Sequence, residues 1–248
     1  MKKIFKMLCI FICILTLSAC NNEETLGEAI MYELSSEFHS LDIEIDVADF
    51  HIESGEKFTI VSNLKDLKIE EKNGILIVKH KTTKNISYTD AIFKLYIPDN
   101  IIFEEVEIKS GAGRFTLNSL FAKSIQFEFG AGQVNIIEVN AYSNIDIKGG
   151  TGEINILNGS FSNLSLVMGV GELNLTALLI GKSDLKFGIS ESNLTLIGTK
   201  DDYSFDIQAG IGNISIDGKK VSELINNENA QNKINIQGGL GEIIISFK

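Results

Sequence analysis

Apolar and polar residues alternate along most of this chain, and Gly-x-Gly tripeptides interrupt the alternation at regular intervals. Two apolar residues, spaced i and i+2, come before each tripeptide, and two more come after it. Period-two alternation rich in Ile, Leu and Val predicts β-strands with one buried face. The tripeptides begin at Gly111, Gly130, Gly150, Gly169, Gly210 and Gly239, and they end at Gly113, Gly132, Gly152, Gly171, Gly212 and Gly241.

One repeat lacks both glycines, and we expect Ser190-Glu191-Ser192 to occupy its slot with two small residues. With this slot included, successive tripeptides start 19, 20, 19, 21, 20 and 29 residues apart. A unit of about twenty residues cannot bury its apolar face alone, whereas stacked units bury it together. The spacing therefore predicts an all-β fold, a parallel β-helix or β-solenoid with coils of about twenty residues.

The phase of the alternation changes across each tripeptide. Ile145 and Ile147 share the parity of Thr151, whereas Ile154 and Ile156 have the opposite parity. A straight strand would turn Ile154 outward, so the chain must bend within the tripeptide to keep both apolar pairs inside. Glycine suits such a corner because it tolerates φ > 0 and close backbone approach.

The repeat places one β-solenoid domain at residues 41–248, with regular coils over 106–248 and irregular coils over 41–105. Leu41 to Ile52 fits the repeat as a diverged first coil. Within the irregular part, Asn73-Gly74 predicts a hairpin turn between two short strands.

The last repeat step is long because of an insertion from Gly218 to Lys233. Val221, Leu224 and Ile225 have the i, i+3, i+4 spacing of a helical turn. We expect the insertion to cover an open end or side of the solenoid, because an uncapped edge would invite pairing with another chain. The alternative is a binding loop.

The N-terminus carries a secretion signal: three lysines precede an apolar run that ends in Leu17-Ser18-Ala19-Cys20. This ending resembles the bacterial lipobox, whose cysteine thiol receives a diacylglyceryl group and becomes the mature N-terminus. The resemblance implies a lipoprotein signal peptide over 1–19, acyl chains of the palmitate type on Cys20, and a lipidated tether over 20–40. The alternative is an ordinary signal peptide cut nearby, which would leave Cys20 as a free thiol.

The apolar run from Met7 to Leu17 is shorter than the roughly 20 residues that a transmembrane helix needs. No second apolar span follows it, so we expect the remainder to lie on one side of the bilayer. The protein is then extracytoplasmic and anchored to the cell membrane through the lipid on Cys20. Its other cysteines, Cys9 and Cys13, fall within the signal, so disulfides and thiolate metal sites are not expected in the folded part.

The net charge of the chain limits the classes of partner that it can bind. The chain has 22 Lys and Arg against 33 Asp and Glu. Without the three lysines of the signal the counts are 19 and 33, so the mature net charge is about −14. That balance disfavours nucleic acid, which requires a basic surface, and direct adsorption to anionic lipid.

A segment Leu-x-Ile-Pro-x-x-Ile at Leu95 to Ile101 comes before the regular strand–Gly-x-Gly–strand units. Together they resemble the bacterial "putative adhesin" family of repeat domains, which are similar to head domains of auto-transporter adhesins. The resemblance covers roughly Leu41 to Lys248 and implies a β-helical fold at the cell envelope. We therefore expect adhesion, or interaction with an envelope protein or glycan. The alternative is an envelope-stress or regulatory lipoprotein that contacts other envelope proteins.

In a solenoid, each repeat position stacks into a ladder along the outside. The position after the tripeptide places Glu153 beside Glu172, about 5 Å away. We expect this pair to form a cation site or a carboxylate pair for sugar chemistry, or else to be two solvated side chains that splay apart. The next strand stacks Asn135, Asn155 and Asn174, whose amides can hydrogen-bond along the axis. Such a polar face could bind glycans, or simply keep the solenoid soluble.

Both ladders continue into the next coil, where we expect Asn193 to follow Glu172 and Thr195 to follow Asn174. A third ladder, on the upstream strand, is interpreted as structural because opposite charges on adjacent strands favour one register. Its members share this alternation of charge: Lys109, Glu128 and Lys148 in sequence, and Lys186 stacked against Asp206.

Catalytic signals are weak. The histidines His39, His51 and His80 are dispersed without metal-ligand spacing, and no Gly-x-Ser-x-Gly motif occurs. The Glu153/Glu172 pair has no basic partner at its own position except Arg114, two coils away. Because some β-helical proteins cleave polysaccharides with clustered carboxylates, a carbohydrate-active enzyme is a minor alternative. We expect a binding protein that uses neither a cofactor nor a metal, in an oligomeric state that the sequence leaves open.

Overall fold

The computed structural model describes residues 26–34, 37–82, 87–221, 227 and 230–248. Within these ranges the chain is all-β, with a single 3-10 turn and no α-helix. No helix of the described part is long and apolar enough to cross a membrane. The expected signal peptide and Cys20, together with Leu224 and Ile225 of the expected helical turn, lie outside the described residues.

All strands belong to one 15-stranded sheet. The strands are β1 (Ile30–Glu33), β2 (Ser40–Gly55), β3 (Thr59–Ser62), β4 (Lys68–Lys72), β5 (Ile75–His80), β6 (Ile92–Pro98), β7 (Ile102–Ile156), β8 (Gly159–Ser162), β9 (Leu164–Ile180), β10 (Lys182–Leu196), β11 (Tyr203–Gln208), β12 (Asn213–Ile216), β13 (Lys219–Lys220), β14 (Asn232–Gln237) and β15 (Leu240–Phe247), and the 3-10 turn η1 spans Lys200–Asp202.

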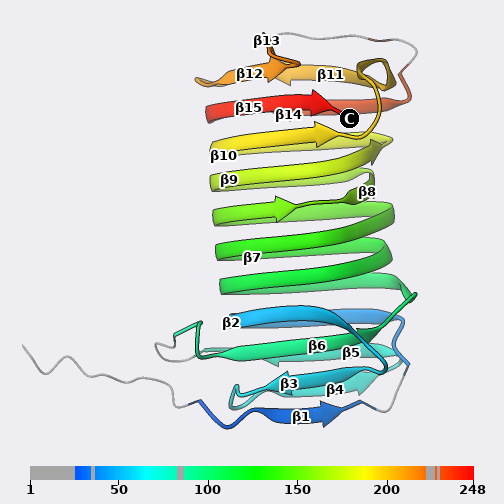
Figure 1. Cartoon of the computed structure of the whole chain (residues 1–248), viewed down its shortest axis with the longest axis vertical. Coiled ribbons are helices and arrows are strands. Elements are labelled where there is room, and N and C mark those ends of the chain that lie inside the picture. Colours follow the sequence, from blue (N-terminus) through cyan, green and yellow to red (C-terminus); the bar gives the residue numbers. More distant parts are fainter. Residues whose placement is uncertain (1–25, 35–36, 83–86, 222–226, 228–229) are drawn as a thin grey trace, which may run out of the picture.

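Most strands lie in parallel, one winding of the chain on the next, as Figure 1 shows. Between β7 and β9, Glu153 pairs with Glu172 and Ile154 with Leu173, an offset of nineteen residues. The same offset recurs between β9 and β10, where Leu175 pairs with Leu194. Because the offset is nineteen or twenty residues from coil to coil in this part of the stack, like residues stack and the alternating apolar side chains all point to one interior.

The interior is one continuous hydrophobic core whose ends are aromatic. Near the N-terminal end, the ring centroid of Phe50 lies 4.9 Å from the centroids of Phe93 and Phe115, and both pairs of rings pack edge to face. At the other end, Tyr203 packs against Phe247 at 5.9 Å. Between these clusters the buried residues are mainly Ile, Leu and Val. Aromatic rings are thus concentrated toward the two ends of the core, and single rings such as Phe161 and Phe187 are buried in the middle coils.

The coils at the C-terminal end do not follow the order of the sequence. β14 and β15 pair with β10 on one side and with β11 and β12 on the other, so the last coil of the chain lies next to last in space. The predicted stacking of Lys186 on Asp206 is therefore wrong: Lys186 pairs with Gln237, and Asp206 with Asn235. An intervening coil separates the two charged residues.

A similar exchange occurs at the N-terminal end. β2 lies between β7 and the later strands β5 and β6, parallel to all three. Beyond them, β3 pairs antiparallel with β6, and β4 pairs antiparallel with β5. The predicted hairpin at Asn73-Gly74, whose φ angles are 51° and 72°, joins β4 to β5. Part of the expected tether is also folded here, since Ile30–Glu33 pairs with β3. Three antiparallel strands, β1, β3 and β4, thus cover this end of the stack.

The predicted corner at Ser190-Glu191-Ser192 is wrong. Ser190 pairs with Gly171, so Gly188-Ile189-Ser190 occupies the slot. Ser192 pairs with Leu173 and is buried, and its hydroxyl oxygen lies 3.2 Å from that of Ser190. A buried serine pair thus replaces an aliphatic contact in this coil and satisfies both hydroxyls.

The described part of the insertion begins as a hairpin. Asp217 and Gly218 have φ of 48° and 72°, and β13 (Lys219–Lys220) turns back antiparallel on β12. These are the positive φ values of a two-residue hairpin turn, which Asp-Gly favours. β13 thus extends the last coil in space, and the chain then returns to place β14 beneath it.

Candidate binding surface

One polar surface is built by the residue that follows each corner. Glu153, Glu172 and Glu191 are paired in successive coils, and Glu242 pairs with Glu191 in the coil after them. We call these four residues the glutamate ladder. Glu191 stands where Asn193 was predicted, because the slot of that coil begins two residues earlier. Like charges directly opposite each other on neighbouring strands repel, so this arrangement costs the fold stability.

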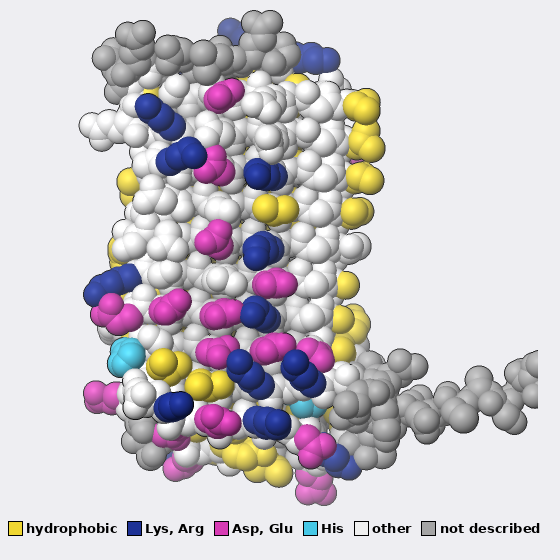
Figure 2. All heavy atoms as spheres, turned by 180° about the vertical axis from the view of Figure 1, so that it is seen from behind, with side chains coloured by type: hydrophobic (Ala, Val, Ile, Leu, Met, Phe, Trp, Pro, Cys, Tyr) yellow, Lys and Arg dark blue, Asp and Glu magenta, His cyan; other side chains and the backbone are white. Residues whose placement is uncertain are grey.

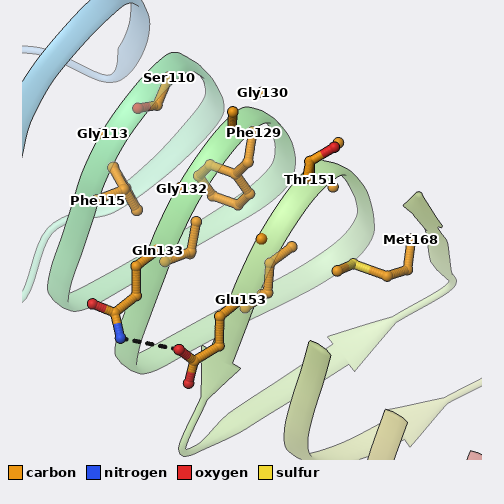
Figure 3. A pocket seen from close by; sticks show the side chains of 16 residues that line it. Ser110, Gly113, Phe115, Phe129, Gly130, Gly132, Gln133, Thr151, Glu153 and Met168 are labelled. Atoms are coloured by element: carbon orange, nitrogen blue, oxygen red, sulfur yellow. Dashed lines mark hydrogen bonds between the residues drawn. The ribbon is translucent and has the colours of Figure 1, made fainter. Parts of the chain in front are cut away.

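The ladder ends differently at its two sides. Toward the N-terminus, Gln133 donates a hydrogen bond of 3.1 Å from Nε2 to Oε2 of Glu153, and Figure 3 shows both side chains on the outside of neighbouring coils. Toward the C-terminus, Glu242 pairs with Asn213. The four carboxylates are thus bounded at each end by a neutral amide.

A second ladder of amides runs beside the carboxylates. Asn155 donates to Oδ1 of Asn135 at 3.1 Å, Asn174 to Asn155 at 2.9 Å, and Asn193 to Asn174 at 2.9 Å. We call Asn135, Asn155, Asn174 and Asn193 the asparagine ladder. Asn193 occupies the rung predicted for Thr195, for the same reason as Glu191. The amides therefore form one hydrogen-bonded row along the stack.

The two ladders are joined within each coil. Asn155 donates to Oε1 of Glu153 at 2.7 Å, and Asn174 donates to Oε1 of Glu172 at 2.8 Å. The Nδ2 group of each of these two asparagines donates one hydrogen bond to a carboxylate and one to the amide of the previous coil. The bonds offset part of the carboxylate repulsion, because hydrogen bonds to charged acceptors are stronger than neutral ones. The result is two pre-ordered rows side by side, one of carboxylates and one of amides.

The cavity that borders Gln133 and Glu153 is small. Figure 3 shows a corner cavity lined by Phe129, Thr151 and Met168, and its volume of about 20 Å³ holds little more than one water molecule. Shallow grooves of about 400 and 460 Å³ lie on a different face, that of the upstream strands, around Lys148 and Asp184. Any ligand of the ladders would therefore lie along an open surface.

The structure also brings together a charged cluster that the sequence reading did not identify. His51 Nε2 lies 3.1 Å from Asp49 Oδ1, and His51 Nδ1 lies 3.8 Å from Glu53 Oε1. Arg114 Nη1 approaches the same oxygen of Asp49 at 3.6 Å, and Lys94 Nζ approaches Glu53 at 3.5 Å. The Asp-x-His-x-Glu spacing on one strand was the available signal, since alternate residues share a face. Because acids and bases pair off here, the cluster is a structural ion network.

No group of three or more His, Cys, Asp or Glu side chains that could hold a metal ion occurs in the described ranges. His39 bonds instead to the carbonyl of Asn73 at 3.0 Å, and His80 lies in the core, so the three histidines do not meet. Glu153 and Glu172 stand next to each other with amide partners rather than with a basic residue. Their arrangement favours recognition of a polar ligand over acid–base chemistry.

The family can be assigned from the chain itself. The family model described as Toastrack DUF4097 matches residues 52–227, well over half of the chain. The chain belongs to this family. The matched region contains the asparagine ladder and three members of the glutamate ladder, whereas Glu242 and the last coil lie outside it. A comparison of this Toastrack chain with curated proteins finds no match.

Solved structures that resemble the Toastrack chain are distant in sequence. A "putative cell adhesion protein" from Clostridium sporogenes is 15% identical, with a TM-score of 0.36, and the alignment covers 90% of this chain and 100% of that one. A "putative adhesin" from Bacteroides fragilis is 11% identical, with a TM-score of 0.43 and coverage of 90% and 99%. A "putative lipid binding protein" from Parabacteroides distasonis is 13% identical, with a TM-score of 0.36 and coverage of 91% and 98%.

Proposed function

We propose that this Toastrack protein is an extracytoplasmic lipoprotein, anchored through Cys20, that presents its ladders for adhesion or for interaction with an envelope protein or glycan. The lipobox-like ending at Cys20 supports the anchor. The described chain enters the fold at one end of the stack, as Figure 1 shows, and the paired coils β11–β12 and β14–β15 lie at the other. An anchor at the entry end would project the remaining coils away from the membrane.

The observation that carries the interaction role is the doubled ladder. Its carboxylate and amide groups recur with every coil, about 4.8 Å apart, and hydrogen bonds hold them in place before any ligand arrives. A repeating surface favours a repeating ligand, because each added contact then forms within the same complex. Hydroxyl-rich polymers such as glycans supply donors for the carboxylates, which makes them the ligand class that we favour.

The proposal includes the regular geometry of the coil. It requires windings of about twenty residues that turn at the Gly-x-Gly tripeptides, since a nearly constant length keeps like residues stacked. The nineteen-residue offset between Glu153 and Glu172 supports the length. The positive φ angles of Gly152 and Gly171, 135° and 134°, support a glycine-specific bend.

The anchor is tested with Cys20→Ala in cells fed an alkyne-labelled fatty acid. Wild type should carry the label and sediment with membranes, and Cys20→Ala should lose the label. Cys13→Ala is the matched control, since it alters a cysteine within the apolar run and should leave labelling unchanged. Labelling that survives Cys20→Ala would exclude this cysteine as the anchor.

The interaction surface is tested with the full chain, purified in detergent, against a glycan array and isolated cell-wall polysaccharide. The double variant Glu153→Gln, Glu172→Gln keeps the shape of the ladder and removes two charges, so it should weaken binding at least tenfold. Glu128→Gln with Asp146→Asn removes two charges from the grooved face and should leave binding unchanged. Equal losses in both variants, or no binding by wild type, would contradict this role for the ladders. Loss of a hydrolytic turnover in the first variant alone would instead identify an enzyme.

A further inference from the structure

A row of exposed apolar side chains follows the middle position of the corner tripeptides. Val170 pairs with Ile189, and Ile189 with Leu240, while the backbone of Ile211 bonds to that of Gly239 in the coil below. The side chains are 45%, 55%, 45% and 89% exposed for Val170, Ile189, Leu240 and Ile211. Figure 2 shows hydrophobic side chains in a row along the right edge of the grooved face. We call these four residues the corner ridge.

The corner ridge is apolar without interruption over four neighbouring coils, about 14 Å in all at the strand spacing. Toward the N-terminus the same position holds Thr151, Ala131 and Ala112, which are smaller. Single exposed apolar residues are ordinary on protein surfaces, whereas a contiguous patch of large ones marks a contact surface. Solubility alone would favour polar residues at a protruding corner.

Opposite charges flank the corner ridge. In three coils of the ridge a ladder glutamate lies two residues after the ridge residue, and Lys186 lies three residues before Ile189. One coil further toward the N-terminus, Lys148 and Glu153 flank Thr151 in the same way. Lys148 shares its coil with Glu153, and Lys186 shares its coil with Glu191. The ridge therefore has an acidic side and, at Lys186, a basic side, and the charge pair beside Thr151 continues this arrangement by one coil.

This pattern is self-complementary under one kind of symmetry. A two-fold axis parallel to the stack, set between two facing ridges, brings each residue of the corner ridge opposite its own copy. The same rotation exchanges the sides, so that Lys186 faces the partner's Glu191 and Lys148 faces the partner's Glu153. A two-fold axis across the stack would instead set glutamates against glutamates. The charges therefore select the parallel arrangement, because like charges across an interface oppose association.

We propose that the corner ridge is the centre of a parallel homodimer, in which a second copy packs ridge on ridge. Such a contact is isologous, with the same patch on both subunits, and it combines an apolar core with a charged rim. Parallel packing leaves both N-termini at the same end, as two chains anchored in one membrane require. A lipid surface fits this strip less well, because the glutamate ladder beside it is repelled by anionic headgroups.

The dimer is tested by disulfide trapping of the full chain in native membranes. Ile189→Cys should give, on mild oxidation, at least tenfold more linked dimer than Ile137→Cys, whose side chain is similarly exposed at 50% but lies outside the corner ridge. Wild type, with its native cysteines, sets the background. Equal yields at the two positions, or linkage of Ile189→Cys to a protein of different mass, would overturn the proposal.

Two further measurements test the orientation and the rim. In a mixture of differently tagged Val170→Cys and Leu240→Cys chains, parallel packing should link like with like, and predominant mixed linkage would refute it. In the Ile189→Cys background, Lys186→Glu should reduce dimer yield severalfold, and adding Glu191→Lys should restore it. Lys182→Glu, away from the rim, should have no effect. Failure of the double exchange to restore the yield would show that these charges do not meet.

Discussion

Valine at Gly152 should destabilise the fold through two separable effects. The φ of Gly152 is 135°, a region that L-residues with side chains rarely adopt. A Cβ atom there would also lie 1.9 Å from the carbonyl oxygen of Gly132 in the neighbouring coil. Because that neighbour is backbone, it cannot rotate away, and the two coils must separate locally.

Gly218 provides the matched control. Its φ is 72°, so a side chain is strained there too, but no atom lies within 4 Å of a Cβ built on it. Backbone strain costs about 1–3 kcal/mol at either position. Overpacking adds about 1–3 kcal/mol at Gly152 alone. The free energy of unfolding should therefore be about 1–3 kcal/mol lower for Gly152→Val than for Gly218→Val.

The measurement is unfolding of the full chain by heat and by urea, followed by circular dichroism of the β signal. For a domain of this size, the added destabilisation corresponds to a Tm about 2–12 °C lower for Gly152→Val. Equal shifts in the two variants would show that the close approach of the coils does not matter. An unchanged Tm for Gly152→Val would refute the corner geometry itself.

The corner column already contains two side chains, those of Ala48, which pairs with Gly113, and of Ser190, and neither residue has a positive φ. Ser190 lies in register with Gly171, but its φ is not among the positive values. Its hydroxyl contacts that of Ser192 in the core. The chain thus accepts a Cβ atom in this column only where the backbone has left the glycine-specific region, which Gly152 has not done.

Three other predictions follow from the ladders and the coil order. Asn174→Ala removes three hydrogen bonds and should lower the unfolding free energy by about 1–3 kcal/mol in urea titrations, more than Asn135→Ala, which removes one. The carboxylate of Asp184 accepts hydrogen bonds from an amide of β14 and from a lysine, which lower its pKa below the usual 3.8. The ionised carboxylate therefore stabilises the fold above pH 4, and this stabilisation is lost as the pH falls further. Hydrogen exchange in β14 should rise at pH 3 in wild type, and this rise should be absent from Asp184→Asn. Removing residues 232–248 should also abolish exchange protection in β11 and β12, because β14 and β15 are their parallel neighbours; persistent protection would mean that they stack directly on β10.

The elements of the fold follow closely from the sequence because each signal is local. Period-two alternation identifies the all-β character, and Asn73-Gly74 identifies a hairpin. The sequence pattern places Ser190 at the start of its corner because Ser190-Glu191-Ser192 has a small residue at each outer position, whereas the corner in the structure begins at a single glycine, Gly188. The constant nineteen-residue step from Gly150 to Gly169 leads directly to Gly188 and would have found it. Asp217-Gly218 was likewise an available hairpin signal.

The order of the coils could not be read from the sequence, because the coils are chemically alike. β10 accepts β14 and β15 through the same alternation of apolar residues by which it pairs with β9. A rule based on periodicity alone cannot distinguish these neighbours. What distinguishes them is the length of chain between them, since the long connection after β12 allows the last coil to reach β10.

The exchanges of order occur at both ends of the stack, and the ends are where a solenoid is most exposed. An end coil presents unpaired backbone groups, which attract further strands unless they are covered. At the N-terminal end the covering elements are the antiparallel strands β1, β3 and β4, the last of which carries the charged sequence Lys-Ile-Glu-Glu-Lys. At the other end, the chain holds β11 and β12 in place with its own last coil and adds β13 at the edge. Folding back thus makes the end coils depend on contacts distant in sequence. The asparagine ladder lies wholly in the repetitive middle, whose neighbours are fixed by the chain itself, whereas the glutamate ladder and the corner ridge extend from the middle into the exchanged coils at the C-terminal end.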